Sequence, residues 1–244
     1  MLYRERFYRR RHQQTLRSAE SVFGTLFPKL PPVKSMLDVG CGVGTWLSAA
    51  KNMGCERVLG LDGPWVPKEM LRIPETSFRT TDLDAADALE EPAFDLAMSL
   101  EVAEHVQPEN AARFVSLLTS ASNVVLFGAA IPGQGGVGHI NEQWPAYWAK
   151  LFADQGYRCL DVVRPAIWQS DIAYWYKQNT LLFVRESSIA EDPVLAALAS
   201  SAPAGPPMAV VHPEAFERAR LGKLRWYVHQ WKRRFRGERD TITV

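Results

Sequence analysis

Short apolar runs alternate with amphipathic stretches along the middle of this 244-residue chain. The apolar runs have the length of strands and are bounded by turn residues, whereas the stretches between them repeat their apolar positions with the period of a helix. This alternation predicts an α/β fold in which a mostly parallel sheet carries helices on both faces. The expected strands span residues 35–39, 57–61, 77–80, 94–100, 123–127, 157–163 and 179–185, and the clearest expected helices span 45–52, 108–120 and 143–155.

Three alternating glycines follow the first expected strand and lead into a helix. Glycine allows a tight strand-to-helix turn and lets the backbone approach a ligand that a side chain would keep away. A dinucleotide-binding loop has the spacing G-x-G-x-x-G, but position 45 is Thr45 and the last glycine comes one residue earlier, at Gly44. The loop therefore reads Asp-x-Gly-x-Gly-x-Gly, which favours a nucleotide cofactor other than a dinucleotide.

This loop resembles the first motif of class I S-adenosylmethionine (SAM) dependent methyltransferases, and the resemblance covers about residues 35–185. It implies a Rossmann-like class I methyltransferase fold whose seven-stranded sheet ends in an antiparallel hairpin, and it implies SAM as the cofactor. In that family the first acid holds the methionine end, the second accepts hydrogen bonds from the ribose hydroxyls, and the third takes the adenine amino group. The implied cofactor-binding residues are Asp38, Gly40, Cys41, Gly42, Gly44, Asp62, Gly63, Asp82, Leu83 and Glu101.

Each of these carboxylates also has a plainer interpretation, in which it caps a helix or is solvated at a strand end. Four acidic positions in order, at the ends of the first four expected strands, favour the cofactor interpretation. Trp65, which lies close to Asp62 in the chain, is open to two interpretations, as an adenine-stacking side chain or as a packing residue.

Candidate catalytic side chains follow the fourth expected strand, in the segment Glu-Val-Ala-Glu-His that begins at Glu101. Methyl transfer from a sulfonium is an in-line displacement, so the protein must chiefly align the acceptor and remove its proton. Spacings of three and four residues would place the acids and the histidine on one face if the segment is helical. With a second histidine in the glycine-rich loop 128–141, the candidate catalytic residues are His139, His105 and Glu104.

This set is similar to the Glu-x-x-Glu-His plus distant His constellation of small-RNA 2′-O-methyltransferases and of ubiquinone-pathway O-methyltransferases, where it holds a divalent ion. A Glu-His pair after the fourth strand is also frequent in metal-free methyltransferases. Three interpretations therefore stay open: a divalent metal site, a metal-free base at His139 or His105, and a structural pair.

Basic residues concentrate at both ends of the chain, although the net charge is only +1. Residues 1–20 carry a charge of +4 and residues 213–244 a charge of +5, so the middle is acidic. We expect a basic helical extension over 1–34, the methyltransferase domain over 35–186, an Ala-, Pro- and Ser-rich linker over 187–212, and a basic amphipathic helix over 213–244. Contact of this last helix with an anionic membrane, packing on a partner subunit and a solvated arm all stay open.

The three cysteines share no metal-binding spacing and predict free thiols in a reducing compartment. Neither an apolar leader nor a run of membrane-spanning length is visible in the sequence. We therefore expect a cytoplasmic protein, with peripheral contact to the inner face of the membrane as an option.

Polar and aromatic side chains mix over residues 168–176, a pattern typical of a lid over a ring-shaped acceptor such as a sugar. The segment 138–148 resembles methyltransferases that accompany bacterial polysaccharide and glycosyltransferase clusters. Our hypothesis is a SAM-dependent O-methyltransferase that acts on a sugar hydroxyl of a glycan or its precursor. The alternatives are a small metabolite, an RNA 2′-hydroxyl, which is less favoured because no RNA-binding module is visible, and a SAM-binding docking subunit without catalysis.

Overall fold

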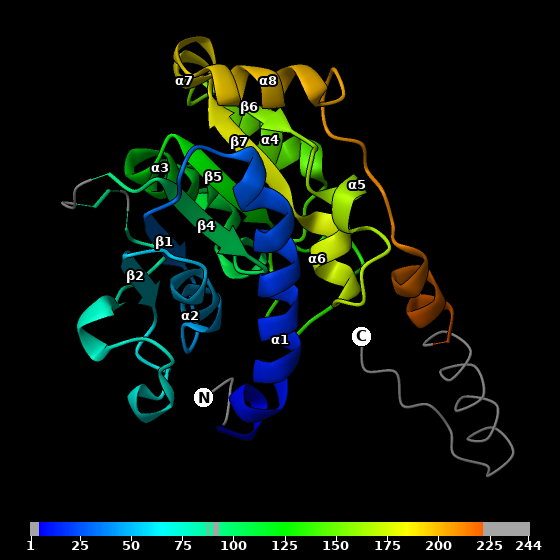
Figure 1. Cartoon of the computed structure of the whole chain (residues 1–244). Helices are drawn as coiled ribbons and strands as arrows, with labels where there is room; N and C mark the ends of the chain where they lie inside the picture. The colour runs from blue at the N-terminus through cyan, green and yellow to red at the C-terminus, as the bar shows by residue number, and fades with distance from the viewer. Residues whose placement is uncertain (1–4, 87, 90–92, 222–244) are drawn as a thin grey trace, which may run out of the picture. The chain divides into compact units, whose positions relative to one another are not determined.

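The structure, a computed structural model, describes residues 5–86, 88–89 and 93–221. The described residues up to 210 form one compact unit, and those from 211 onward belong to a second. The described part of the first unit builds a seven-stranded sheet with the order β3-β2-β1-β4-β5-β7-β6 (Figure 1). Its strands are β1 (Ser35–Val39), β2 (Arg57–Asp62), β3 (Phe78–Thr80), β4 (Leu96–Leu100), β5 (Val124–Gly128), β6 (Tyr157–Leu160) and β7 (Leu181–Arg185).

Strands β1 to β5 pair in parallel, and β7 is antiparallel to both β5 and β6. The seven-stranded, mostly parallel sheet with an antiparallel hairpin is confirmed. The strand order changes direction between β1 and β4, and in doubly wound sheets ligands bind at the carboxyl ends of the strands at that position.

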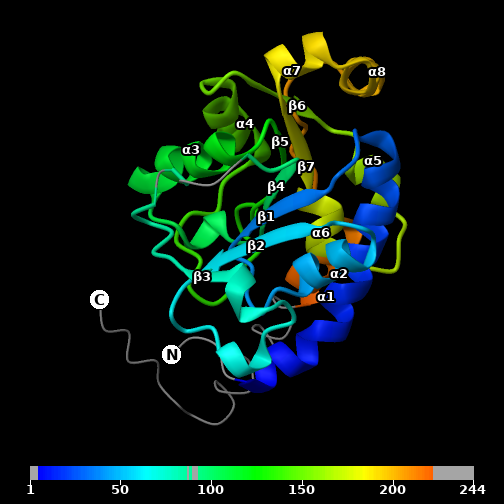
Figure 2. The ribbon, with the colours of Figure 1, turned by 60° about the vertical axis from the view of Figure 1, so that its left-hand side comes forward.

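Helices cover both faces of the sheet, as predicted. Figure 2 shows α3 and α4 on one side, and α1, α2, α5 and α6 on the other. The helices are α1 (Glu5–Leu26), α2 (Thr45–Asn52), α3 (Ala111–Ala121), α4 (Pro145–Ala153), α5 (Arg164–Ile167), α6 (Tyr174–Asn179), α7 (Glu186–Glu191) and α8 (Pro193–Ser201). Single 3₁₀ turns are η1 (Phe27–Lys29), η2 (Lys68–Met70), η3 (Glu75–Ser77), η4 (Ala103–His105) and η5 (Pro108–Asn110).

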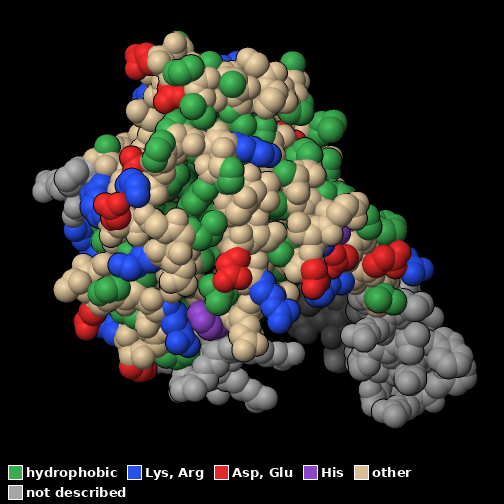
Figure 3. All heavy atoms as spheres, in the orientation of Figure 1, with side chains coloured by type: hydrophobic (Ala, Val, Ile, Leu, Met, Phe, Trp, Pro, Cys, Tyr) green, Lys and Arg blue, Asp and Glu red, His purple; other side chains and the backbone are tan. Residues whose placement is uncertain are grey.

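Charged side chains of both signs are interspersed over the face seen in Figure 3, without a continuous basic or acidic field among the residues drawn in colour. Ion pairs on the surface, such as Lys68 with Glu75 and Lys150 with Asp154, join exposed side chains. Exposed pairs of this kind contribute about 0–1 kcal/mol each. The stability of the fold therefore comes mainly from its buried apolar side chains.

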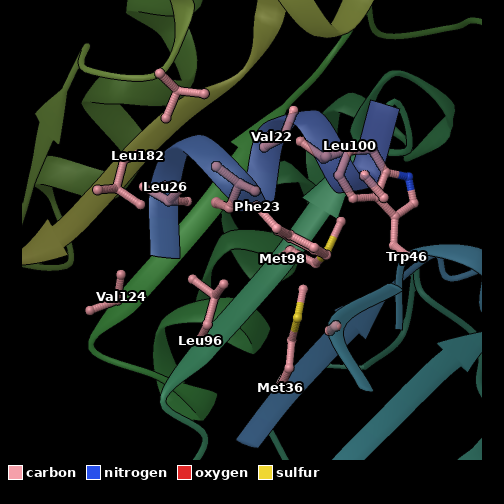
Figure 4. Close-up of a cluster of buried hydrophobic side chains, with 14 of the residues drawn as sticks. Val22, Phe23, Leu26, Met36, Trp46, Leu96, Met98, Leu100, Val124 and Leu182 are labelled. Carbon is pink, nitrogen blue, oxygen red and sulfur yellow. The ribbon is translucent and has the colours of Figure 1, made fainter. Parts of the chain in front are cut away.

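Side chains alternate between the two faces of the sheet along each strand and so contribute to two buried clusters, one on each face. Met36 and Leu96 point to the α1 side, whereas Leu37 and Ala97 point to the α3 side. Figure 4 shows the first cluster, in which side chains of α1 and α2 lie over four strands of the sheet. The side chains labelled there are Val22, Phe23, Leu26, Met36, Trp46, Leu96, Met98, Leu100, Val124 and Leu182.

Helix α1 belongs to this core and is not an extension. Val22, Phe23 and Leu26 are at most 1% exposed, and Phe23 packs edge-on against Trp46 of α2, with 5.3 Å between the ring centroids. The expected boundary at residue 35 is therefore too late. The arginines in the first half of the helix suggest a solvated extension, whereas the apolar residues that pack into the core lie in its second half.

The expected linker over 187–212 is wrong in its first half, where the structure has α7 and α8. Ile189, Leu195 and Leu198 are at most 7% exposed and pack into the cluster on the α1 side of the sheet. Asp192 begins α8 by accepting hydrogen bonds from the Val194 and Leu195 N–H groups. Alanine-rich sequence favours a helix, and a few well-spaced apolar residues suffice to bury one face of it.

The second unit is described only up to residue 221, and residues 213–221 are helical. The basic helix predicted over 213–244 lies for the most part outside the described residues. Within the described ranges, no helix has both the length and the apolar character that crossing a bilayer requires.

Some of the aromatic side chains in the segment 168–176 belong to the buried core and do not form a lid. Tyr174 and Tyr176 of α6 are 9% and 8% exposed, and Tyr176 packs edge-on against Trp46. Both rings are buried against other parts of the protein, so they cannot cover an acceptor. The prediction of a lid is therefore wrong for these two tyrosines.

Replacing Phe23 by Ala should test the role of α1 in the core. We expect Phe23→Ala to lower the free energy of unfolding by about 3–5 kcal/mol, because it removes a fully buried ring that packs on both Phe27 and Trp46. Urea unfolding followed by circular dichroism measures this change. In the control Gly24→Ala, on the exposed side of the same helix with open space at its Cβ, stability should rise by about 0.5–1 kcal/mol. A small effect of Phe23→Ala would contradict the assignment of α1 to the core.

Candidate active site

The glycine run forms the turn between β1 and α2. Gly40, Gly42 and Gly44 have φ angles of 86°, 54° and 77°, a region that glycine adopts far more readily than other residues. Two of the positions also lack room for a side chain. A Cβ on Gly40 would lie 2.3 Å from Val102 Cγ2, and one on Gly44 would lie 2.8 Å from Ile73 Cγ1. The path of this loop therefore requires its glycines.

The carboxylate of Asp62, the last residue of β2, holds the glycine loop in place. Its Oδ2 accepts a hydrogen bond from the Gly42 N–H at 2.7 Å, and its Oδ1 accepts one from the Gly63 N–H at 2.7 Å. Burial raises the pKa of Asp62, while these two hydrogen bonds partly offset that effect. The predicted ribose acid thus lies directly beside the loop.

Asp38, on β1, is a carboxylate whose burial lowers the stability of the fold. It is 2% exposed, and its Oδ2 has no hydrogen-bond partner among the described residues. Burial, together with the charge of Asp62, raises the pKa of Asp38 well above its ordinary value. A buried carboxylate oxygen without a partner destabilises a fold, and such groups are typical of functional sites.

Cys41 turns its side chain into the core. It is 7% exposed, and its Sγ would lie 2.5 Å from a Cβ on Gly60 of β2, so glycine at that position makes room for the thiol. Burial and the charges of Asp38 and Asp62 raise the pKa of Cys41 well above its ordinary value. The thiol of Cys41 is therefore buried in the core, and only the backbone of this residue contributes to the loop surface.

Asp82 and Leu83 follow β3, the strand next to β2. Asp82 is exposed, and its Oδ1 accepts a hydrogen bond from the Asp84 N–H at 3.1 Å, which stabilises the turn after the strand. Because β1, β2 and β3 pair in parallel, the carboxylates of Asp38, Asp62 and Asp82 lie along one edge of the sheet.

Glu101 adopts a different geometry from the one expected. It directly follows β4 and is the one non-glycine residue within the described ranges that has a positive φ, of 58°. Its Oε1 accepts a hydrogen bond from Asn179 Nδ2 at 2.7 Å, and its Oε2 accepts one from Gln134 Nε2 at 2.6 Å. The left-handed backbone interrupts any helix here, so Glu101 does not share a helical face with Glu104 and His105.

The candidate catalytic residues lie together at the edge of the sheet. Glu104 and His105 are on η4, and His139 comes from the long loop between β5 and α4. The two imidazole rings meet edge to face with 4.8 Å between centroids, and His139 Nε2 is 3.8 Å from Glu104 Oε1. One possible ligand atom from each of the three residues lies within 4.8 Å of the others.

Hydrogen bonds at Nδ1 orient both imidazole rings. His139 Nδ1 is 2.9 Å from Glu142 Oε1, and His105 Nδ1 is 3.0 Å from the Gly138 carbonyl oxygen. An ionised carboxylate and a carbonyl only accept hydrogen bonds, so each Nδ1 is the donor. In the neutral rings the lone pair is therefore on Nε2, where it can take a proton or bind a metal ion.

Burial sets the charge of this cluster. Burial lowers the pKa of His105, and the nearby His139 adds to this effect. Burial and the charge of Glu101 raise the pKa of Glu104 well above its ordinary value. Burial alone would raise the pKa of Glu142, but hydrogen bonds from His139 and from the loop backbone outweigh it and lower that pKa. Glu142 is thus the carboxylate that the structure favours in its ionised form.

The donor set of Glu104, His105 and His139 fits a divalent metal ion. Two imidazoles and one carboxylate with further positions open are a common arrangement in catalytic metal sites. The hydrogen bonds at both Nδ1 atoms are of the kind that orients metal-bound histidines. Glu104 Oε2 has no hydrogen-bond partner in the part of the chain that the structure describes. The same geometry also suits a base that works without a metal.

Glu142 is a candidate functional residue that the sequence analysis missed. Besides His139, it accepts hydrogen bonds from the Gly133 and Gly135 N–H groups, both at 2.8 Å. It therefore fixes the shape of the glycine-rich loop and the orientation of the histidine in that loop. The available signal was an acidic side chain three residues after a histidine in a stretch without apolar periodicity.

Comparison with known proteins bears on the cofactor-binding half of the chain and on the fold. The family model described as "Methyltransferase domain" matches residues 7–127, which include most of α1, the glycine loop and all four acidic positions. No curated protein matches the sequence.

Several solved structures share the fold at low sequence identity. The sugar N-methyltransferase KedS8 from Streptoalloteichus sp. ATCC 53650 has a TM-score of 0.59 and 14% identity, over 76% of this chain and 94% of that one. DesVI from Streptomyces venezuelae has a TM-score of 0.53 and 15% identity, over 74% and 96%. An O-methyltransferase family protein from Burkholderia thailandensis has a TM-score of 0.54 and 13% identity, over 74% of this chain but only 57% of its own length.

The family match covers the strands and the loop that build the cofactor edge, and the solved structures share the arrangement of the sheet. Residues 7–127 therefore match the methyltransferase-domain model, and the chain has the fold of the class I, SAM-dependent methyltransferases.

Proposed function

We propose that this chain transfers the methyl group of SAM to a sugar hydroxyl in a glycan or a glycan precursor. The observation that carries the cofactor part is the glycine loop, which Asp62 holds in place and which directly follows the buried Asp38. The unpartnered Oδ2 of Asp38 suits the charged methionine end, and the carboxylate of Asp62 suits the ribose hydroxyls. Asp82 and the Leu83 backbone would take the adenine. When bound, SAM supplies a methyl group that is already activated for displacement.

His139 is the residue that we assign to the acceptor proton. An aliphatic hydroxyl needs a base or a metal ion before it can attack. The Nε2 of His139 can accept a proton because its Nδ1–H is donated to Glu142. Glu104 and His105 border the same position.

The sugar acceptor rests on indirect support. One of the structures with the same fold is a sugar N-methyltransferase, and the segment 168–176 still offers partly buried Trp168 and Trp175 beside polar groups. RNA is less favoured, because no RNA-binding module is visible in the sequence.

The basic C-terminal segment supports a second part of the proposal, peripheral contact with an anionic membrane from the cytoplasmic side. Residues 213–244 hold nine Lys or Arg residues against four acids. Each basic residue near an anionic surface contributes about 1 kcal/mol of attraction. Lipid-linked glycan precursors are built at such surfaces, so this contact would bring the enzyme to its acceptor.

The acceptor can be identified by transfer of a radiolabelled SAM methyl group into fractionated cell extract. We expect label in the lipid-linked glycan fraction. Label in the RNA or small-molecule fraction would contradict the sugar acceptor, and no label despite bound S-adenosylhomocysteine (SAH) would favour the docking subunit. A parallel reaction with a chelator tests the metal: we expect the label to persist, because His139 can act as the base alone, whereas its loss and recovery with added Mg²⁺ or Mn²⁺ would assign the cluster to a metal ion.

His139→Ala should abolish methyl transfer without changing SAH affinity. Removing a general base typically lowers turnover by about 10²–10⁴-fold, and this side chain takes no part in the glycine loop or its acids. Turnover and isothermal titration calorimetry with SAH measure the two effects on one preparation. Unchanged turnover would remove His139 from the mechanism.

Asp38→Asn should make the protein more stable and a weaker cofactor binder. At pH 7 we expect the free energy of unfolding to rise by about 1–3 kcal/mol, because the variant no longer buries an unpartnered carboxylate. Since burial raises the pKa of Asp38, the cost exists only above the ordinary carboxyl pKa. The gain should therefore shrink as the pH is lowered and vanish below about 4, where the carboxyl becomes protonated in both states. Urea unfolding at several pH values checks this, and equal SAH affinity in wild type and variant would contradict the role of Asp38 in binding.

A further inference from the structure

We propose that Glu101 is a positioning residue for methyl transfer, because its carboxylate attaches the glycine-rich loop 128–141 to the end of β4 through Gln134 and so fixes where His139 lies. This inference rests on the proposed function, which assigns the acceptor proton to His139. It gives Glu101 a role other than the cofactor contact that the sequence resemblance implies.

Side chains from three separate segments form one hydrogen-bond network around Glu101. Both of its carboxylate oxygens take part, with Asn179 Nδ2 and Gln134 Nε2 as the donors. Gln134 Oε1 in turn accepts from Asn179 Nδ2 at 2.9 Å and from Gln178 Nε2 at 3.0 Å. Gln178 and Asn179, at the end of α6, are 0% and 3% exposed. The network therefore forms where little water competes for its donors and acceptors.

The left-handed backbone of Glu101 belongs to the same junction. A non-glycine residue keeps such a conformation only where the surrounding contacts impose it. The Glu101 N–H donates to the Gly128 carbonyl oxygen at 2.8 Å. Gly128, the last residue of β5, lies against the end of α6, since a Cβ on it would be 3.2 Å from the Asn179 carbonyl oxygen. The ends of β4, β5 and α6 thus meet at Glu101, and its turn directs the carboxylate toward the two amides.

Gln134 connects this network to the imidazole of His139. It lies between the two glycines whose N–H groups bind Glu142, and Glu142 in turn orients the His139 ring. Glu142 and His139 are only three residues apart, so their contact orders the loop internally. The bond from Gln134 to Glu101 joins that ordered loop to the sheet.

Other contacts hold the loop close to His139 itself. The Ile140 and Asn141 N–H groups donate to the Glu104 carbonyl oxygen at 2.9 and 3.0 Å. Gln134 adds an attachment five residues before the histidine, on the opposite side of it. A loop attached on both sides of His139 keeps the imidazole in place, whereas a loop attached on one side can tilt. A displacement of about 1 Å in a reacting group can lower a rate by about 100-fold.

Glu101→Gln tests this role, because glutamine keeps the shape of the side chain but offers the two amide donors only one oxygen. We expect the maximal rate of label transfer from SAM into the fractionated extract to fall about 10–100-fold. The KM for SAM and the affinity for SAH should stay unchanged. Initial rates at varied SAM and isothermal titration calorimetry with SAH, both on the full chain, measure these quantities. The control Glu109→Gln, which neutralises an exposed carboxylate elsewhere, should change none of them.

A double variant, Glu101→Gln with Gln134→Glu, separates the hydrogen bonds from a need for charge at position 101. It exchanges the carboxylate and the amide, so the side chain at position 101 donates to the one at position 134, and Gln178 and Asn179 keep acceptors. We expect the rate to recover to within about threefold of wild type, because the two substitutions compensate each other.

Gln134→Ala removes the same attachment from the loop side and leaves Glu101 in place. We expect the same fall in rate, again with unchanged SAH affinity. Hydrogen exchange over residues 128–141, followed by mass spectrometry without substrate, gives a readout that does not depend on turnover. Exchange should be faster than in wild type in both single variants and should return to the wild-type rate in the double variant.

The outcomes distinguish this inference from the proposed function. Weaker SAH binding by Glu101→Gln would make Glu101 a cofactor contact and overturn the positioning role. With an active wild type, an unchanged rate in Gln134→Ala would also overturn it. A double variant no faster than Glu101→Gln would do the same, because the carboxylate would then be needed at position 101 itself. If wild type transfers no label to any fraction, the proposed function fails, and the inference fails with it.

Discussion

The hydrogen bond from the Gly42 N–H to Asp62 is the contact on which the cofactor edge of this protein depends. It fixes a loop of glycines in left-handed conformations to the end of the neighbouring strand, and it brings a second carboxylate close to the buried Asp38. Two acids near each other in a low-dielectric environment destabilise the folded chain. The large apolar clusters on both faces of the sheet, including the one that α1 completes, provide the stability that offsets this cost.

The glycine-rich loop that carries His139 is ordered in the same way. Glu142 gathers the N–H groups of Gly133 and Gly135 much as Asp62 gathers those of Gly42 and Gly63. In both places a carboxylate orders a loop that has few side chains of its own, because glycine N–H groups are accessible and charge-assisted hydrogen bonds are strong. The two loops follow β1 and β5 at the carboxyl edge of the sheet, so the sheet itself positions the segments that carry the candidate site residues.

Much of the fold could be predicted from the sequence, because buried parallel strands are continuous apolar runs and the glycine loop has a distinctive spacing. The meeting of His139 with Glu104 and His105 could be inferred only from family resemblance, since no spacing relates residues so far apart. The left-handed backbone at Glu101 and its amide partners Gln134 and Asn179 have no local signature. The helices α7 and α8 were missed because an Ala- and Ser-rich stretch looks the same whether its few apolar residues are buried or solvated.

Glu142 gives the order of the loop and the orientation of His139 one common cause. The same carboxylate makes both sets of contacts. Ordering of the loop and orientation of the His139 ring are therefore coupled, and a shift in one changes the other. If His139 is the base proposed above, an acceptor that packs against the loop and steadies it also raises the fraction of molecules in which the imidazole is correctly oriented. Under that proposal, an acceptor with many loop contacts is recognised partly by how fast it reacts, and a poor fit lowers the rate even where the acceptor still binds.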